Sequence, residues 1–244
     1  MPTIIAEALC IRHWDWSETS QTVSLFTRDH GLIRALAKGA KRDNAPFSGG
    51  LELLTRGHAV AIVKASTELA TLTSWDLAEI FPGIRTGLRP FYSAMYIADL
   101  LHRLVHDSDP HPGMFDAAIS ALRSLSKGQD PDACLAFVQW WLIVNAGYKP
   151  NLEIEHSQGQ PPTSYTFAPR SGGLVQTPPG DGSPAWGVRA ATVRTLRELD
   201  DAGPASAIPA ASESLSRSAR LLAGYIRELL GTNIPAQDLL FARP

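Results

Sequence analysis

The chain has 244 residues and a hydrophobic content of 44%, which suits one large core or two small ones and excludes a disordered tail. Its 22 lysines and arginines against 24 aspartates and glutamates give a net charge of −2, which excludes a protein coated in positive charge. Any contact with nucleic acid must therefore be local.

The first third of the chain has the pattern of a small β-barrel. Turn-forming residues separate short apolar segments, and no long helical pattern lies between them. The first three predicted strands cover residues 3–12, 19–27 and 32–38. The fourth combines two segments, 51–54 and 59–64, and the fifth covers 69–78. Five short strands of this kind predict an OB-fold barrel over residues 1–80.

The hairpin at residues 23–42 is the most informative part of this barrel. Gly31 tolerates the positive φ that closes a tight turn, and the period of two then places Arg34 and Lys38 on one face. Cationic side chains gather here, and we assign five of them to DNA binding: Arg28, Arg34, Lys38, Lys41 and Arg42. The alternative is a solvated barrel face, since residues 1–80 hold eight lysines and arginines against nine acids.

Two tryptophans, Trp14 and Trp16, precede the hairpin. An aromatic side chain at a barrel edge can stack on a base, which is worth about 1–3 kcal/mol. The alternative is that one of the two plugs the end of the barrel. We assign Trp14 to the predicted DNA-binding surface.

From residue 89 onward the apolar period becomes helical, which predicts a helical domain over residues 81–244. Asp130 and Pro131 form an N-cap and first-turn pair that opens a strongly apolar helix, expected at the centre of the domain. The predicted helices cover residues 90–105, 114–125, 131–145, 189–199 and, at the C-terminus, 212–231. The sequence thus predicts an α+β protein, with an OB-fold barrel followed by an all-helical domain.

Motifs for catalysis, nucleotide binding and metal binding are missing. The sequence has no phosphate-binding loop, nucleophile elbow or zinc-protease helix, so we expect a protein that is not an enzyme. Cys10 and Cys134 lie in apolar runs and are expected to be buried thiols. His102 and His106 have a spacing that can hold a metal, but a solvated helix end is favoured.

The chain also lacks the features of a membrane or exported protein. Its longest apolar run, residues 134–146, is shorter than the ~20 residues that a membrane span needs. The N-terminus has no basic signal region. We expect a cytoplasmic protein without membrane contact.

Short motifs recur in one order along nearly the whole chain. They cover residues 18–20, 25–28, 30–31 and 37–42 in the barrel, then 94–101, 137–150 and 220–231 in the helical domain. Each motif is weak alone, but the set in register is specific. It resembles the RecO family of bacterial recombination mediators.

The resemblance implies a function and partners. RecO proteins bind single- and double-stranded DNA, anneal complementary strands, and act with RecR to help RecA replace the single-strand-binding protein SSB. The resemblance also implies the C-terminal tail of SSB as a partner and a nucleoid-associated location. That tail is acidic and apolar, so a helical groove with a basic rim would suit it. Four arginines of the helical domain are candidates for the rim: Arg103, Arg123, Arg217 and Arg220. The alternative is an adaptor that binds RecR and the SSB tail with little DNA affinity of its own.

The stretch at residues 149–187 departs from the family. Its seven prolines and six glycines predict irregular structure. Many RecO proteins carry a four-cysteine zinc ribbon here, whereas this stretch has no cysteine, and Glu155 with His156 does not make a closed structural site. We expect a degenerate zinc-ribbon-like insertion without metal, and no cofactor. After the final helix, residues 234–237 replace the basic run that the family commonly has.

Overall fold

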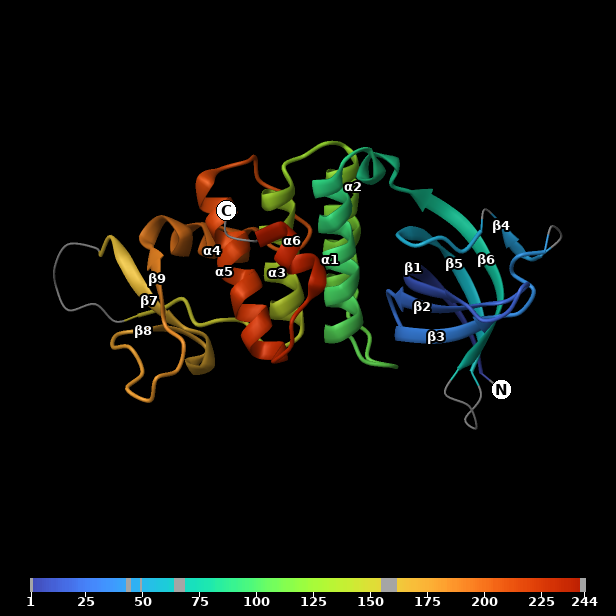
Figure 1. Ribbon diagram of the computed structural model, residues 1–244, viewed down its shortest axis with the longest axis horizontal. Coiled ribbons are helices and arrows are strands. Elements are labelled where there is room, and N and C mark those ends of the chain that lie inside the picture. Colours follow the sequence, from blue (N-terminus) through green and yellow to red (C-terminus); the bar gives the residue numbers. More distant parts are fainter. Residues whose placement is uncertain (1, 43–44, 49, 64–68, 155–161, 242–244) are drawn as a thin grey trace.

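The computed structural model describes residues 2–42, 45–48, 50–63, 69–154 and 162–241. Figure 1 shows an elongated molecule with three parts in a row. A β-barrel forms one end, a layer of helices forms the middle, and a small sheet forms the opposite end. This arrangement confirms the predicted α+β class with an N-terminal OB-fold.

The barrel closes through one parallel pairing. Its strands are β1 (Thr3–Asp15), β2 (Gln21–Thr27), β3 (Gly31–Ala37), the two-residue β4 (Phe47–Ser48), β5 (Thr55–Ile62) and β6 (Ala70–Ile80). Neighbours are antiparallel in the order β3-β2-β1-β5-β6, and β3 pairs in parallel with β6 to complete the ring. A five-stranded ring of this kind has the strand order of an OB barrel.

Alternation along β3 decides which side chains enter the barrel. Ile33, Ala35 and Ala37 are buried inside it, while Arg34 on the opposite face is exposed. This confirms the predicted period of two. Small alanines suit the crowded interior of a barrel this narrow.

Three details of the barrel differ from the sequence-based prediction. β1 continues to Asp15, because a bulge between Cys10 and Arg12 lets it stay paired with β2 beyond the predicted end. Residues 51–54 form no strand, since Leu54 has a positive φ and its amide donates to the carbonyl of Cys10. The Gly-rich stretch at residues 47–50 predicts a turn, but its first two residues, Phe47–Ser48, form the short strand β4. Lys64, at the end of a predicted segment, lies outside the described residues.

The helical domain is built around α3. Its elements are η1 (Pro82–Thr86), α1 (Leu88–Leu104), α2 (Pro112–Ser126), α3 (Pro131–Asn145), α4 (Ala190–Ala202), α5 (Glu213–Leu230) and α6 (Pro235–Phe241). α3 is buried on nearly all sides, and Asp130 caps it by accepting from the amide of Ala133 at 2.9 Å, as predicted. α6 was not predicted, because its seven residues are too few to show a period.

The insertion is more regular than the sequence predicts. β7 (Ser164–Ala168), β8 (Gly173–Val175) and β9 (Trp186–Arg189) form an antiparallel sheet in the order β8-β7-β9, with the one-turn η2 (Pro169–Ser171) between β7 and β8. Phe167 of β7 contacts the ring of Tyr225 on α5 edge-on, at 5.3 Å between centroids. Burial of Phe167 against α5 therefore holds the sheet on the helices.

The barrel packs firmly on the helical domain. Leu9, Ile11 and Phe26 point out of the barrel into the core of the helices, and the rings of Phe26 and Phe115 lie 5.6 Å apart. Residues 8–11 are thus buried on both faces of β1, which explains their continuous apolar run. The two parts share a core and are not joined by a linker alone.

Candidate nucleic-acid interface

Two loops at one end of the barrel are joined by hydrogen bonds. The amide of Gly39 donates to Ser20 Oγ at 3.1 Å, and the amide of Lys41 donates to the carbonyl of Thr19 at 3.1 Å. Gly39 has a φ of +67°, which favours glycine and turns the chain after β3. The β1–β2 loop and the β3 loop therefore form one continuous edge.

This edge brings an aromatic ring and two cations together. Trp16, Lys38 and Arg42 all line one open cavity of about 370 Å³, and we call these three residues the Trp16 edge. Trp16 is 63% exposed, so its ring is free to stack on a flat ligand. Among the described residues, Lys38 and Arg42 form no ion pair.

Lys41 lies at the same end but is already neutralised. Its Nζ lies 2.6 Å from Asp15 Oδ1, at the last residue of β1. The hydrogen bond from Lys41 holds the pKa of the Asp15 carboxyl below its usual value. Lys41 therefore offers less free charge to a ligand than its exposure implies.

The other two predicted cations face the helical domain: Arg28 lies at the opposite end of the hairpin, and Arg34 lies in the middle of β3. Arg28 makes a two-pronged contact with Asp116 of α2, at 3.0 and 2.9 Å. Arg34 lies 3.6 Å from Asp107 in the α1–α2 connection. The structure therefore separates the five predicted cations into two groups. Arg28, in particular, joins the barrel to the helical domain.

Trp14 is also separate from the Trp16 edge. It lines a different cavity of about 310 Å³ between β1 and α1, together with Met95 and Asp99. The residue that accompanies the free cations is Trp16, which the sequence analysis considered but did not assign. The signal that could have found it is the length of β1, because a strand that reaches Asp15 includes Trp14 and leaves only Trp16 in the loop.

Two of the four predicted partner arginines serve internal contacts. Arg123 of α2 binds both carboxylate oxygens of Glu79 on β6, at 2.8 and 2.7 Å, and this lowers the pKa of Glu79. Arg103 donates to Thr232 Oγ1 at 3.2 Å. Both join elements of the fold.

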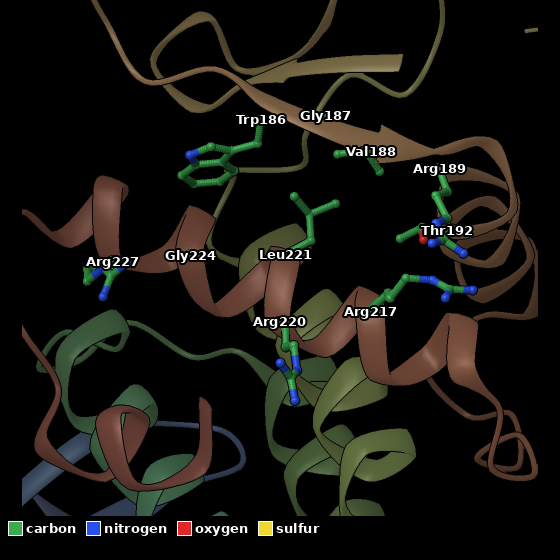
Figure 2. Close-up of a pocket in the computed structure, with 10 residues that line it drawn as sticks. All are labelled: Trp186, Gly187, Val188, Arg189, Thr192, Arg217, Arg220, Leu221, Gly224 and Arg227. Carbon is green, nitrogen blue, oxygen red and sulfur yellow. The ribbon is translucent and has the colours of Figure 1, made fainter. Parts of the chain in front are cut away.

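The remaining two, Arg217 and Arg220, lie in a groove between β9 and α5. Figure 2 shows this groove, a cavity of about 420 Å³, in which Leu221 points from α5 toward β9. Arg189 and Arg217 lie together at one end, near Thr192, whereas the Arg220 side chain extends from α5 away from β9. The lining of the groove also includes Arg189 and Arg227, which the sequence analysis did not single out. We call it the β9–α5 groove.

No metal cluster is seen in the part of the chain that the structure describes. No group of three or more His, Cys, Asp or Glu side chains is placed to hold an ion there. Burial raises the pKa of both Cys10 and Cys134 to about 12, so neither is a reactive thiolate. Glu155 and His156 lie outside the described residues.

None of the helices that the structure describes combines the length and the apolar character that crossing a bilayer requires.

Comparison with known proteins gives matches over nearly the whole chain. The family model "Recombination protein O N terminal" matches residues 1–81, and "Recombination protein O C terminal" matches residues 85–238. A DNA repair protein RecO from Geobacter sulfurreducens is 30% identical over 245 residues, which covers 100% of this chain and 98% of that protein.

Two further relatives match over shorter stretches. DNA repair protein RecO from Bacillus pumilus is 31% identical over 70% of this chain and 66% of its own length. The protein of the same name from Rhodopirellula baltica is 40% identical over 53% of this chain and 48% of its own length. The matched part of this chain thus spans only about half to two thirds of these two relatives.

Proposed function

The chain belongs to the RecO family of recombination proteins, and on that premise we propose that it is a non-enzymatic mediator of DNA repair and recombination. It binds single- and double-stranded DNA and anneals complementary strands. With RecR, it helps RecA replace SSB on single-stranded DNA, in the cytoplasm at the nucleoid. The observation that carries the proposal is the Trp16 edge on an OB-fold barrel.

The chemistry of the Trp16 edge suits a single strand. Lys38 and Arg42 supply charge for two phosphates, and each neutralised phosphate releases counterions. Trp16 supplies a ring on which any base can stack, because every base has a π-face. The contacts proposed here are made to phosphates and to the face of a base, neither of which distinguishes one sequence from another, so binding is expected to be independent of sequence.

Annealing follows from the same geometry. A strand held by its backbone and by one stacked base keeps its other bases free to pair. Partial neutralisation of phosphates also lowers the repulsion between two strands. The direct test is annealing of complementary oligonucleotides by the purified protein, with and without an SSB coating. If the protein accelerates annealing neither with nor without the SSB coating, the proposal is wrong.

One observation favours the alternative, an adaptor that binds RecR and the SSB tail. Three of the five predicted DNA-binding cations, Arg28, Arg34 and Lys41, are paired with carboxylates. Free positive charge on the barrel is therefore scarce. A gel shift with the isolated protein, with and without RecR, separates the two: a shift that requires RecR supports the adaptor.

Replacing Asp15 by asparagine is expected to tighten DNA binding. The change releases Lys41 for a third phosphate, so the slope of log affinity against log salt steepens by about 0.7 for single-stranded DNA. Asp201→Asn is the matched control, because it changes the net charge equally on the distant helix α4. Equal effects of the two variants would show that Lys41 does not reach DNA.

The two tryptophans are expected to respond differently to an oligonucleotide. In Trp14→Phe the quenching of tryptophan fluorescence on adding oligothymidine persists, because Trp14 lies between β1 and α1. In Trp16→Phe most of the quenching disappears, because the stacking ring is gone. If quenching is lost only in the Trp14 variant, the DNA interface lies at the cavity between β1 and α1 and not at the Trp16 edge.

We propose that the insertion keeps its sheet without metal and that the chain takes no cofactor. Aromatic packing replaces metal ligation: Trp186 stacks on Phe167 with centroids 6.0 Å apart, and Phe167 lies on Tyr225. Elemental analysis of protein purified without added metal tests this. Zinc at one equivalent would contradict it.

A further inference from the structure

Three of the ion pairs that join the barrel to the helical domain have the same polarity. In each of them an arginine of the barrel meets an aspartate of α1, of α2 or of the connection between these two helices. The pairs are Arg12 with Asp99, Arg28 with Asp116, and Arg34 with Asp107. The helical domain thus sets acidic groups against cations of the barrel, and each pair lowers the positive charge that a phosphate can reach.

The pair of Arg34 and Asp107 is the loosest of the three. Arg34 Nη2 lies 3.6 Å from Asp107 Oδ1, which is longer than a hydrogen bond, whereas the Arg12–Asp99 pair measures 2.6 Å. The side chains of Arg34 and Asp107 are both 53% exposed. A pair of this length and exposure contributes little to stability.

The α1–α2 connection is held on the barrel by its backbone. The amide of Leu32 donates to the carbonyl of His106 at 3.2 Å, and Asp107 forms an isolated β-bridge with Gly31. Ser108 has a φ of +60°, a strained conformation that persists only because the contacts around it hold the chain. Backbone contacts therefore position the Asp107 carboxylate, and the main effect of that carboxylate is on the charge of Arg34.

Arg34 has room beside it for a ligand. It lines an open cavity of about 310 Å³ together with Asp107 and Ser108. The cavity lining carries two aspartates, Asp29 and Asp107, against the single arginine, so it repels an anion. Neutralising Asp107 would remove one of these two acids and leave Arg34 without its partner.

Arg34 is also close to the Trp16 edge along the chain. Lys38 follows the end of β3, four residues after Arg34, and both side chains are exposed. Four residues of extended chain span about 13 Å. Single-stranded sites on OB folds cover about 4–16 nucleotides, so one strand held at the Trp16 edge is long enough to reach Arg34.

We propose that Asp107 is an autoinhibitory residue, which masks Arg34 and thereby confines a bound DNA strand to the Trp16 edge. The inference rests on the proposed DNA-binding role of that edge and adds what limits it. Asp116 does not share this role, because its two-pronged contact with Arg28, at 3.0 and 2.9 Å, has the short distances of a structural joint.

The test measures the binding of labelled oligothymidine by fluorescence anisotropy over a salt series. Asp107→Asn is expected to tighten binding about fivefold and to steepen the slope of log affinity against log salt by about 0.7, since Arg34 gains one phosphate. Asp109→Asn is the matched control. It changes the net charge equally in the same connection, but Asp109 pairs with His111 and lies outside the cavity lining.

Arg34→Ala separates a local mask from a general effect of charge. In the otherwise wild-type protein it is expected to change binding little, because Arg34 is already neutralised by Asp107. In the Asp107→Asn background it is expected to abolish the whole gain, because the released cation is gone. A gain that persists without Arg34 overturns the inference.

The melting temperature distinguishes the mask from a joint between the two domains. Asp107→Asn is expected to melt close to the wild type, since a loose, half-exposed ion pair stabilises little. A clearly lower melting temperature without tighter DNA binding would show that the pair only fastens the connection, and the inference would be wrong.

The outcomes for this inference and for the proposed function are separate. Equal slopes for the Asp107 and Asp109 variants, in a protein that binds DNA through Lys38 and Arg42, overturn only the mask. DNA binding that appears only in Asp107→Asn supports the mask and contradicts the proposed role of the Trp16 edge. An absence of binding in every variant overturns both.

Discussion

Exchanging both Lys38 and Arg42 for alanine is expected to flatten the salt dependence of DNA binding. Each lost phosphate contact reduces the slope of log affinity against log salt by about 0.7 for single-stranded DNA, so the double variant loses about 1.4. Affinity falls to a similar extent for all sequences, because these contacts read only the backbone. Fluorescence titrations of labelled oligonucleotides over a salt series measure both effects.

The matched control for this double variant removes two cations elsewhere. Lys127 follows α2 and Arg194 lies on α4, both exposed and both on the helical domain. Their joint replacement by alanine changes the net charge equally but leaves the Trp16 edge intact. If both double variants keep the wild-type slope, the Trp16 edge is not the DNA-binding surface.

Gly31→Ala is expected to destabilise the protein by about 2–5 kcal/mol, the sum of a left-handed backbone and a steric clash. Gly31 has a φ of +68°, and a Cβ there would lie 2.5 Å from the amide nitrogen of Asp109. The next residue, Leu32, donates to the carbonyl of His106 at 3.2 Å. The barrel thus contacts the α1–α2 connection through backbone atoms, which leave no room for a side chain.

Gly128→Ala separates the two causes of that effect. Gly128 also has a positive φ, of +82°, but a Cβ there would meet no atom within 4 Å. Its replacement should therefore cost only the left-handed conformation, about 1–2 kcal/mol. Chemical denaturation of the two variants measures the difference. Equal losses of stability would show that the contact between Gly31 and residues 107–109 does not hold the domains together.

The barrel and the β7–β9 sheet lie at opposite ends of the molecule. Figure 1 places the barrel at one end and the β7–β9 sheet at the other, with the helices between them. A DNA strand on the Trp16 edge would therefore leave the β7–β9 sheet and the β9–α5 groove accessible. This separation suits a mediator that holds DNA while it contacts a protein bound to the same strand.

The sequence was sufficient for the architecture wherever one local pattern decides the structure. Alternation along residues 32–38 predicted the inner face of β3, and Asp130 with Pro131 predicted the start of α3. Where a segment packs against a distant part of the chain as well as its own neighbours, prediction from the sequence was wrong or incomplete. Residues 8–11 are buried on both faces, so their alternation is hidden, and the sheet at 164–189 depends on packing against α5.

The sequence by itself determined the family, the two-part fold and the presence of basic residues in one hairpin. Only the tertiary structure decided which of those residues have free charge. Arg28 and Asp116 are 88 positions apart, and no local pattern reveals that they meet. The same holds for Lys41 with Asp15, and for Trp16, which hydrogen bonds between two loops bring beside Lys38 and Arg42. Coulomb energy depends on distance in space, so the charge available to a ligand is a property of the folded chain.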